Sequence, residues 1–465
     1  MKLLYRWLLF VAACILLGVG VVLLCIFLND SPSVRVKSKT AGIANSESAP
    51  ETQIATSPMM EPAVLPKHTY KAPIFIQEPP PWDGYDRVHI MQSRSLAMSS
   101  DGKTLAIGAP YAPCVYVQTK RTGKWMHETV LYEESRSLSW FGLGISLSAD
   151  GNTLACGALN MSKVWIYTRA DSIWTTQAEL SGPAGSGYGV STALSYDGNT
   201  LAIGSNNIPQ PYQPGLQPHV YIFTRNGVEW TLQQTLNPTD SIGYSNFGYS
   251  IALSGDGCTV VAGGYTDRAN TGAIWVSQRA PMTDSWSTPL KIVVEVSPSK
   301  NQGRRVAVSG DGSTIAFTEI DHDLEFWAGD FRSKWMTTGR TYVFINTGKN
   351  TWRILSNLTP HVASAGASVC LNHNGERLFI GDTASGCVYV FSKTGRTFYK
   401  QESTITLENP TIYEQLTFGA SLAIDAWGET LAIGVPYERG PEDIFGMPNE
   451  TFGEPIVGAT FVYET

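Results

Sequence analysis

The stretch FGLGISLSADGNTLACGALNMSKVWIYTR, residues 141–169, contains the pattern that decides the fold. Short apolar runs flank the pair Asp150-Gly151, and a further run, VWIYT, follows in the same stretch. Asp-Gly between alternating apolar runs is a strong signal for a β-hairpin, because glycine tolerates the positive φ that such turns require. A fourth segment with a tryptophan, IWTTQAEL, comes next. The unit therefore predicts an antiparallel sheet of four short strands.

The glycine of this turn recurs along the chain at intervals of 47 to 63 residues. An aromatic residue followed by glycine stands ten residues before it in four copies, and a second glycine stands six residues after it in six copies. Only Thr318 interrupts the second pattern. Seven copies of a four-stranded unit predict an all-β fold, a seven-bladed β-propeller of four-stranded blades. The turn glycines are Gly102, Gly151, Gly198, Gly257, Gly312, Gly375 and Gly428.

The seventh copy ends at Thr465 after only three strands, so its fourth strand is expected elsewhere in the chain. Residues 70–80, YKAPIFIQEPP, resemble the fourth segments WTLQQTLNP and WRILSNLTP in their apolar spacing and closing proline. We therefore expect residues 70–80 to be the closing strand of the last blade, which makes 70–465 the propeller. Such closure pairs sheet edges that would otherwise stay exposed.

The repeats resemble FG-GAP repeats, which form the seven-bladed propeller of integrin α-subunit ectodomains and of related bacterial and viral surface proteins. The resemblance rests on the Phe-Gly start, on Gly108-Ala109-Pro110 at the end of strand two, and on the strand VYVF. Calcium-binding integrin blades carry several acidic residues between strands one and two, whereas loops such as SADGNT hold one. One carboxylate does not supply the six to eight oxygens that Ca²⁺ prefers, so we expect neither a calcium site nor a cofactor.

Two other propeller classes fit less well. WD repeats also contain a turn of the form S-x-D-G-x-T-L, but they run about 40–45 residues with Gly-His and Trp-Asp marks, and these marks do not occur at the expected places. Sialidase-type Asp-boxes place one residue between Asp and Gly before Thr-Trp, and that spacing fails here. Both classes remain alternatives.

The N-terminal region predicts a membrane anchor on a stalk. Residues 7–28 are an apolar run of 22 residues, which as a helix spans roughly 33 Å, enough for the hydrocarbon core of a bilayer. A cleaved signal peptide is the alternative, although its apolar region usually has about 7–15 residues. We expect a single-pass signal anchor after a short tail, residues 1–6, and then a flexible stalk rich in Ser and Pro, residues 29–69.

The charge balance limits the classes of partner. The formal net charge of −7 argues against a nucleic-acid binder, which would carry a basic patch or stripe. We expect an extracellular or lumenal propeller in type II orientation, on a cell or virion envelope, although basic residues flank both ends of the apolar run and do not decide the orientation. Asn160, Asn357 and Asn449 are glycosylation candidates in that compartment.

Partner binding is expected on one face of the propeller. The Asp-Gly turns lie at one end of the strands, and the longer connections lie at the other end, which should point away from the membrane. Those connections hold insertions in repeats three, five and seven, and loops on a rigid scaffold often carry binding residues. Packing of the aromatic residues onto their own loop is the alternative. The partner-binding candidates are Tyr212, Asp321, Asp323, Trp327, Phe331, Trp335, Tyr437 and Phe445.

Signals for catalysis and for metal binding are weak. Asp321-His322-Asp323 has three potential ligands without further spaced ligands, so we expect no metal site. No nucleophile elbow, phosphate loop or paired-histidine motif occurs, which predicts a protein that is not an enzyme. The cysteines beyond the apolar run are five in number, and no two are clearly placed for a disulfide, which suggests free buried thiols.

These observations predict a membrane-anchored recognition or adhesion protein that binds a protein or glycan ligand on an opposing surface. A propeller enzyme acting on glycans through a site on the central axis is one alternative. A structural component of a membrane envelope or coat is another. The sequence leaves the ligand, the source and the oligomeric state open.

Overall fold

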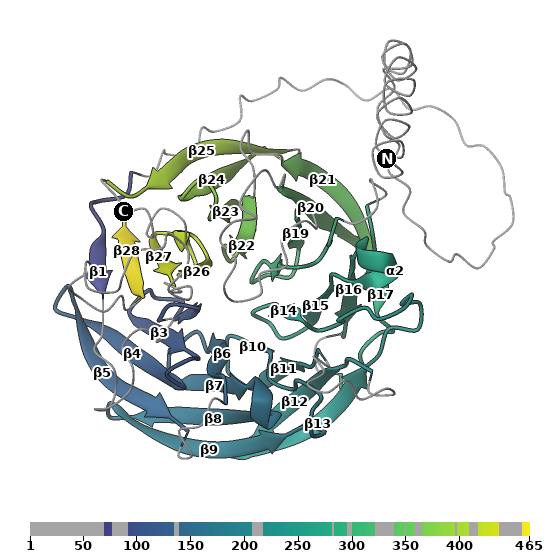
Figure 1. Ribbon diagram of the computed structural model, residues 1–465, viewed down its shortest axis with the longest axis horizontal. Helices are drawn as coiled ribbons and strands as arrows, with labels where there is room; N and C mark the ends of the chain where they lie inside the picture. Colours follow the sequence, from purple (N-terminus) through teal and green to yellow (C-terminus); the bar gives the residue numbers. More distant parts are fainter. Residues whose placement is uncertain are drawn as a thin grey trace, which may run out of the picture. The chain divides into compact units, whose positions relative to one another are not determined.

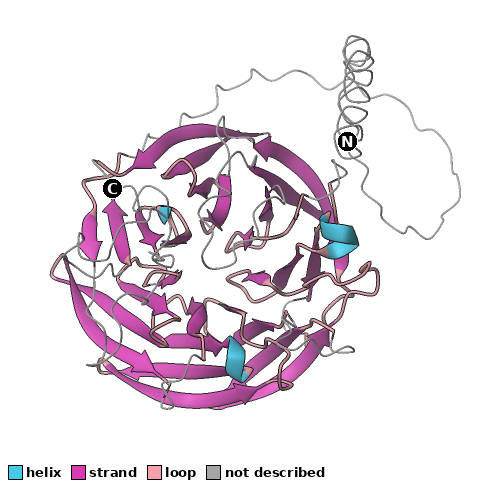
Figure 2. Ribbon diagram, in the orientation of Figure 1, coloured by secondary structure: helices cyan, strands magenta, loops and turns pink. Residues whose placement is uncertain are grey.

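Seven four-stranded antiparallel sheets surround a central axis, with the first strand of each sheet innermost (Figure 1). Among the described residues almost all regular structure is strand, and helix is confined to short turns (Figure 2). The all-β, seven-bladed propeller of four-stranded blades expected from the repeats is therefore confirmed. The computed structural model describes residues 69–76, 92–133, 139–206, 217–280, 283–294, 300–320, 339–348, 350–358, 365–395, 398–408, 417–436 and 458–465.

The first four blades follow the chain in order, each sheet running from inside to outside. Blade 1 comprises β2 (Ser95–Met98), β3 (Thr104–Ala109), β4 (Cys114–Arg121) and β5 (Lys124–Tyr132). Blade 2 comprises β6 (Phe141–Leu147), β7 (Thr153–Ala158), β8 (Lys163–Ala170) and β9 (Ile173–Ser181). Blade 3 comprises β10 (Ser191–Leu194), β11 (Thr200–Gly204), β12 (Val220–Asn226) and β13 (Glu229–Leu236). Blade 4 comprises β14 (Ser250–Leu253), β15 (Thr259–Gly264), β16 (Ala273–Gln278) and β17 (Leu290–Ile292).

The last three blades complete the ring. Blade 5 comprises β18 (Val306–Val308), β19 (Thr314–Ile320), β20 (Gly339–Gly348) and β21 (Thr351–Leu358). Blade 6 comprises β22 (Ala365–Leu371), β23 (Arg377–Asp382), β24 (Cys387–Thr394) and β25 (Phe398–Thr406). Blade 7 comprises β26 (Ser421–Ile424), β27 (Thr430–Val435), β28 (Ala459–Glu464) and β1 (Ile74–Ile76). The short helical turns η2 (Leu159–Met161) and α2 (Asp267–Asn270) connect strands two and three of blades 2 and 4.

Blade 7 takes its outer strand from the N-terminal side of the propeller. Strand β1 pairs antiparallel with β28, with Ile74 opposite Val462. The Tyr70 hydroxyl donates a hydrogen bond to the carbonyl oxygen of Gly428 at 2.7 Å, so the chain reaches β1 from the end where the turns between strands one and two lie. Pairing of the first and last strands of the propeller, β1 and β28, in one sheet closes the ring.

The Asp-Gly turns are held by a serine and the aspartate itself. In blade 2, Asp150 Oδ1 accepts hydrogen bonds from the Ser148 hydroxyl at 2.6 Å and from the Asn152 N–H at 2.9 Å. Gly151 has φ +69°, which a residue without a Cβ adopts at little cost. In blade 7 the carboxylate stands two residues earlier: Asp425 accepts from the N–H groups of Trp427 and Thr430, and Trp427 remains 56% exposed.

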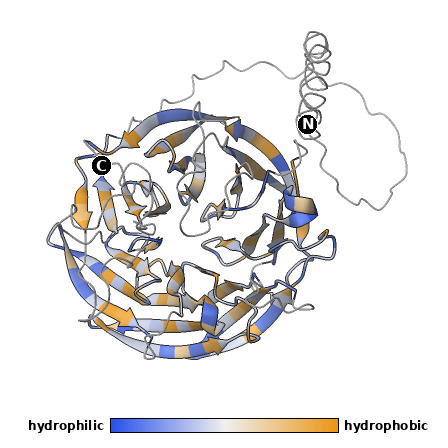
Figure 3. Ribbon diagram, in the orientation of Figure 1, coloured by the Kyte–Doolittle hydropathy of each residue, from blue (hydrophilic) through white to orange (hydrophobic). Residues whose placement is uncertain are grey.

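The hydrophobic core lies between neighbouring sheets. The second strands, such as β3 and β7, are buried along their whole length, because successive side chains of a strand point to the two adjoining sheets. Apolar and polar segments both occur along the strands of the ring (Figure 3). The aromatic residue of the Phe-Gly pair is central to this packing: Phe141 is fully buried and its ring lies 5.6 Å from the ring of Trp165 in an edge-to-face arrangement. Val115 and Val117 of blade 1 belong to the same cluster. The Phe-Gly signal therefore reflects a position between two blades.

The recurrent glycine of strand two marks a close backbone contact between blades. A Cβ built on Gly157 would lie 2.0 Å from the carbonyl oxygen of Gly189, the glycine of the next Tyr-Gly pair. Gly263 stands in the same relation to Gly303, at 1.9 Å. The glycine thus permits an approach that any side chain would block. This is the physical reason for the second glycine pattern in the sequence.

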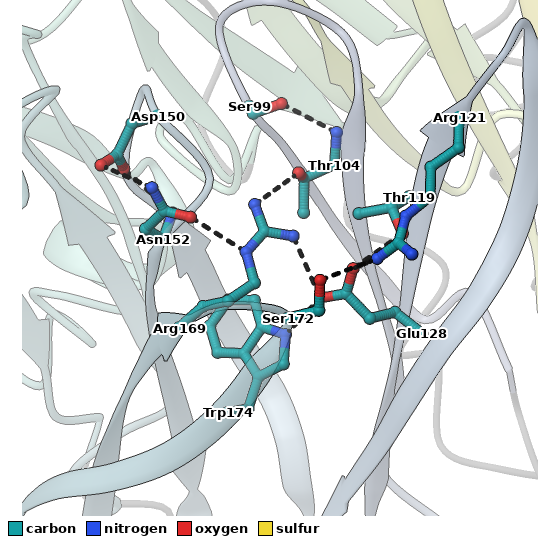
Figure 4. Close-up of polar contacts among 10 residues, drawn as sticks. All are labelled: Ser99, Thr104, Thr119, Arg121, Glu128, Asp150, Asn152, Arg169, Ser172 and Trp174. Atoms are coloured by element: carbon teal, nitrogen blue, oxygen red, sulfur yellow. Dashed lines mark hydrogen bonds and ion pairs between the residues drawn. The ribbon is translucent and has the colours of Figure 1, made fainter.

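Side-chain hydrogen bonds connect neighbouring blades in the outer part of several interfaces. The contact between blades 1 and 2 is the example drawn in Figure 4. Arg169, on β8, donates to Thr104 Oγ1 and Glu128 Oε1 of blade 1, at 3.0 and 3.1 Å. The indole N–H of Trp174 donates to the same Glu128 oxygen at 2.8 Å. Blades 2 and 3 repeat the arrangement with Arg225, Thr153, Gln177 and Trp230.

Several expectations fall outside the residues that the structure describes. These are the N-terminal tail, the apolar run 7–28, and the stalk except for its last residue. In the part of the chain that is described, no helix has the length and apolar character needed to cross a membrane. Cys114, Cys156, Cys258, Cys370 and Cys387 are all free thiols, as expected, but Cys258 and Cys370 are only half-buried.

Replacement of Gly157 by alanine tests the blade contact. The new methyl group would meet backbone rather than a movable side chain, so the blades must separate, and we expect a loss of about 3 kcal/mol in the free energy of unfolding. Gly123→Ala is the control, because its Cβ would meet nothing within 4 Å and only its φ of +79° opposes alanine, at about 1 kcal/mol. Equal losses in urea unfolding would contradict the close contact.

Replacement of Glu128 by glutamine tests the polar contact and copies the glutamine of the next interface. Burial raises the pKa of Glu128, but hydrogen bonds from Thr119, Trp174 and Arg169 outweigh it and hold this pKa below its ordinary value of 4.5. The carboxylate therefore stabilises the fold above about pH 4.5, and this contribution disappears as the pH falls through the lower, folded-state pKa. We expect Glu128→Gln to cost on the order of 1 kcal/mol at pH 7.

The loss should shrink as the pH falls below about 4.5, because protonated Glu128 and glutamine then offer the same neutral acceptor. Urea unfolding at a series of pH values measures the difference between the two proteins. Gln177→Glu at the next interface provides the reverse swap. A loss that does not depend on pH would show that the Glu128 charge has no part in the contact.

Candidate functional site

The two ends of the propeller axis have different structures. In each blade, strands one and two are joined by a short turn, and we call the end of the axis where these seven turns lie the turn face. The Phe-Gly pairs and the connections from strand two to strand three lie at the opposite end, which we call the loop face. The three insertions therefore leave the blades on the loop face, between β11 and β12, β19 and β20, and β27 and β28.

A closed circle of backbone hydrogen bonds joins all seven turns at the turn face. Each bond connects the turns between strands one and two of neighbouring blades, with donor–acceptor distances of 2.8 to 3.0 Å. This circle holds the inner strands at one spacing around the axis. The N–H to C=O bonds run from Ser100 to Ala149, Ala149 to Tyr196, Tyr196 to Gly255, Gly255 to Gly310, Asp311 to His373, His373 to Ala426 and Ala426 to Ser100.

Two side chains cross the axis at the turn face. Tyr196 of blade 3 and His373 of blade 6 stack with ring centroids 5.4 Å apart, and the Tyr196 hydroxyl lies 3.3 Å from His373 Nδ1. Burial raises the pKa of Tyr196, with a smaller contribution from Asp311. A Cβ on Gly310 would lie 2.3 Å from both of these side chains. Small residues elsewhere in the circle thus make room for the stacked pair, which occupies the axis.

The loop-face end of the axis is surrounded by the residues that follow the Phe-Gly pairs. Four of these seven positions are small or apolar, and three hold Arg94, Tyr249 and Arg304. The next position is serine in five blades, and its hydroxyl donates to a backbone carbonyl of the following blade, as Ser191 does to Gly248 at 2.8 Å and Ser421 does to Ser93 at 2.6 Å. In blade 5 this serine is replaced by arginine, Arg305.

We call Arg94, Arg304 and Arg305 the arginine cluster. The Arg305 guanidinium lies 5.8 Å from the ring of Tyr249, and that of Arg304 lies 5.4 Å from the ring of Tyr265. The two tyrosine rings are 4.7 Å apart and nearly perpendicular. Arg305 Nε donates to the Ala367 carbonyl at 3.0 Å and thereby holds its guanidinium in place. Blade 1 lies across the ring from blades 4 and 5, so Arg94 approaches the others across the axis.

The electrostatics of Tyr249 show how closely the three arginines converge. Burial raises the pKa of Tyr249, yet the charges of Arg304, Arg305 and Arg94 outweigh burial and lower this pKa from 10.0 to about 7. Burial lowers the pKa of Arg305; Tyr249 opposes this shift, and Arg94 and Arg304 add to it. The strongest charges acting on Tyr249 are thus all positive. None of the ion pairs within the described ranges includes a member of the arginine cluster.

The partner-binding residues expected from the sequence are not among those that the structure describes. Tyr212, Asp321, Asp323, Trp327, Phe331, Trp335, Tyr437 and Phe445 all lie outside the described ranges, as does the sequon residue Asn449. Asn160 lies in η2 on the loop face and is exposed, and Asn357 is exposed on the outer strand β21. Across the described residues, no group of three or more His, Cys, Asp or Glu side chains is placed to bind a metal ion.

The arginine cluster is the feature that the sequence prediction missed. Its signal is present in the repeats: serine stands two residues after the Phe-Gly glycine in five copies, and Arg305 breaks this pattern. Aligning the position directly after the glycine would likewise have separated Arg94, Tyr249 and Arg304 from four small or apolar residues. Alignment alone does not bring blades 1, 4 and 5 together, because that proximity depends on closure of the ring.

Comparison with protein families supports the repeat assignment. A family model described as FG-GAP repeat matches residues 230–277. This segment begins at Trp230 on the outer strand of blade 3 and ends on the third strand of blade 4. The match therefore covers one structural repeat, counted from the outer strand of one blade. No curated protein matches the sequence.

Comparison with solved structures shows the fold. The Kuenenia stuttgartiensis hydrazine synthase chain is 14% identical with a TM-score of 0.53, covering 76% of this chain and 96% of that chain. U3-55K is 14% identical with a TM-score of 0.52, covering 85% and 98%. The β-propeller domain of Myceliophteria thermophila Cps50 (Swd1) is 12% identical with a TM-score of 0.52, covering 85% and 100%. At these identities the similarity concerns architecture alone.

Titration of Tyr249 tests the convergence of the arginines. Because the folded-state pKa lies below the ordinary value of 10.0, ionised Tyr249 stabilises the fold at high pH, and this contribution is lost as the pH falls through about 7. We expect near-ultraviolet absorbance to show one tyrosinate forming near pH 7. Tyr249→Phe should remove that step and leave the tyrosines that ionise at higher pH. A first step above pH 9 in the folded protein would contradict the geometry.

Proposed function

We propose that this protein is a membrane-anchored recognition protein with a propeller similar to that of integrin α-subunits, and that its loop face binds a protein or glycan on an opposing surface. In this proposal the apolar run 7–28 anchors the chain and residues 29–69 act as the stalk. The propeller is extracellular or lumenal in type II orientation. Binding, rather than catalysis, is its activity.

The difference between the two ends of the axis carries this proposal. At the turn face, backbone groups bond each other around the ring, and Tyr196 stacks on His373 over the axis. Those groups are satisfied within the propeller. At the loop face, three arginines converge with no acidic partner among the described residues. A group of like charges that lie close together is typical of a surface that meets a ligand of opposite charge.

The entry of the chain agrees with this orientation. Tyr70 contacts Gly428 at the turn face, so a stalk preceding residue 70 joins the propeller on that side. The loop face is then the end that faces away from an anchor at residues 7–28. Exposed Asn160 on the loop face is available for a glycan in a lumenal or extracellular compartment.

A blocking experiment distinguishes the two faces. Gln217 is exposed on the loop face and Glu376 is exposed on the turn face, so a cysteine at either position accepts a polyethylene glycol chain. Cys258→Ser serves as the background, because Cys258 is half-exposed in a turn. We expect particles displaying the full chain to adhere to cultured cells, the label at Gln217→Cys to abolish adhesion, and the label at Glu376→Cys to leave it unchanged.

The adhesion experiment also tests the candidate aromatic residues of the blade-five insertion. Trp327→Ala combined with Trp335→Ala should reduce adhesion at least tenfold if these side chains contact the partner, with the melting temperature nearly unchanged. A large fall in melting temperature would instead assign them to packing of their own loop. Adhesion that both labels leave intact would contradict binding by the loop face. Protease accessibility of the propeller in intact vesicles tests its orientation.

A further inference from the structure

The arginine cluster differs from the other arginines of the propeller in what surrounds it. Some arginines of the propeller meet acids: Arg169 lies 3.1 Å from Glu128 Oε1 across a blade interface, and Arg377 lies 3.6 Å from Glu402 Oε2 within blade 6. Arg225 meets the uncharged Gln177 in the outer part of the interface between blades 2 and 3. Arg304 and Arg305 instead lie against tyrosine rings, and Arg305 also donates to two backbone carbonyls. Within the described ranges the cluster is thus a positive site without an acidic ion-pair partner, in a chain whose formal net charge is −7.

Converging guanidiniums are unfavourable in the absence of an anion. Arginine stays protonated at any physiological pH, so repulsion is not relieved by loss of a proton. All three arginines are only half-exposed, and water screens them less than it screens charges on an open surface. Tyr249 offsets part of this repulsion, because the positive charges favour its ionised, negatively charged form. One weak acid still leaves positive charge in excess.

The geometry of the cluster prepares hydrogen-bond donors for a ligand. A guanidinium that lies over a ring uses its face for that contact and keeps the N–H groups in its own plane free to donate. Arg305 is fixed by its bonds to the carbonyl oxygens of Ala367 and Arg304, at 3.0 and 3.2 Å. The planar fork of arginine matches the paired oxygens of carboxylate, sulfate and phosphate groups. Little reorganisation is therefore needed to receive such a group.

We propose that Arg94, Arg304 and Arg305 bind an oxyanion, a carboxylate, sulfate or phosphate group, on the propeller axis at the loop face. This assignment rests on the proposed function, for which it names the chemistry of the partner. The oxyanion comes either as a free ion or as the acidic substituent of a sugar on a glycan. It is received between blades 1 and 5, close to Tyr249, at the centre of the face from which the three insertions extend.

The test uses the full chain purified in detergent and four probes: sodium sulfate, sodium phosphate, sodium acetate and sodium glucuronate, at constant ionic strength in chloride. A bound oxyanion offsets the positive charge that favours ionised Tyr249. It should therefore raise the pKa of Tyr249 and reduce tyrosinate absorbance at pH 7.5. We expect a saturable decrease with at least one probe, together with saturable heat in calorimetry. Glucuronate binding tenfold tighter than acetate identifies a sugar-borne group; equal binding identifies the free ion.

Arg94→Gln and Arg304→Gln are the test variants, because the structure shows neither side chain in a hydrogen bond or ion pair with another described residue. Each should weaken the dissociation constant at least tenfold, while the melting temperature without ligand stays the same or rises. Arg353→Gln, an exposed arginine on β21, changes the net charge equally and should leave binding unchanged. Equal responses in all three variants, or no response beyond chloride, would overturn the assignment.

Adhesion of the double variant, Arg94→Gln with Arg304→Gln, separates this assignment from the proposed function. In one outcome, the label at Gln217→Cys still blocks adhesion but the double variant does not affect it. This result overturns the oxyanion as the partner group and leaves the proposal of binding by the loop face intact. If neither label blocks adhesion, the loop-face proposal fails, whereas the probe titration still decides whether the arginines bind an oxyanion. Loss of adhesion in the double variant, with Arg353→Gln unaffected, supports both.

Discussion

Contact between neighbouring blades near the axis is the constraint on which the rest of this structure depends. The inner strands approach so closely that Gly157 lies directly against the carbonyl of Gly189, and only a residue without a side chain allows that distance. The serine at the start of the inner strand then satisfies the corresponding carbonyl, as Ser191 does for Gly248. Repetition of this contact sets the angle between blades, and a circle of backbone hydrogen bonds at the turn face holds the same spacing.

Closure of the ring has a consequence for large side chains. Most residues around the axis are small. A large side chain there fits only if residues of other blades leave space for it. Tyr196 and His373 stack only because Gly255 and Gly310 leave the space that these rings fill. At the other end, the charge of Arg94 acts across the axis on Tyr249, together with the charges of the blade 5 arginines. Each face therefore has its own axial structure, one satisfied within the chain and one positively charged.

Blade 5 departs most from the common unit near the axis. Thr318 stands where six blades have the strand-two glycine, and it packs against Gly366 of the next blade. Arg305 replaces the inner-strand serine, and its side chain reaches the carbonyl of Ala367 instead. Both changes occur at the interface between blades 5 and 6, where a charged side chain replaces the hydrogen bond of the standard serine. A repeat protein tolerates such a local exchange because each blade contacts chiefly its neighbours.

Local sequence was sufficient to predict the blades. The Asp-Gly turn, the Phe-Gly aromatic and the strand-two glycine each reflect short-range geometry or contact with one neighbour, so their spacing alone indicated seven sheets. The departure at Trp427 was also visible, and its reason is local. Asp425 stands in the position of the turn serine and accepts from the Thr430 N–H as that serine does, and it also accepts from the Glu429 N–H in place of the missing aspartate. The tryptophans of the outer strands were visible too, but their bonds to the preceding blade, such as Trp174 to Glu128, were not.

The sequence by itself determined the class of fold, the number of blades and the need for a closing strand, because periodic spacing encodes local hydrogen bonding and packing. Only the tertiary structure decided which residues meet on the axis. Arg94, Tyr249 and Arg304 come from repeats separated by more than 150 residues at the extremes, and nothing in their spacing relates them. They converge because seven blades of fixed angle close into a ring, which brings opposite blades within electrostatic range.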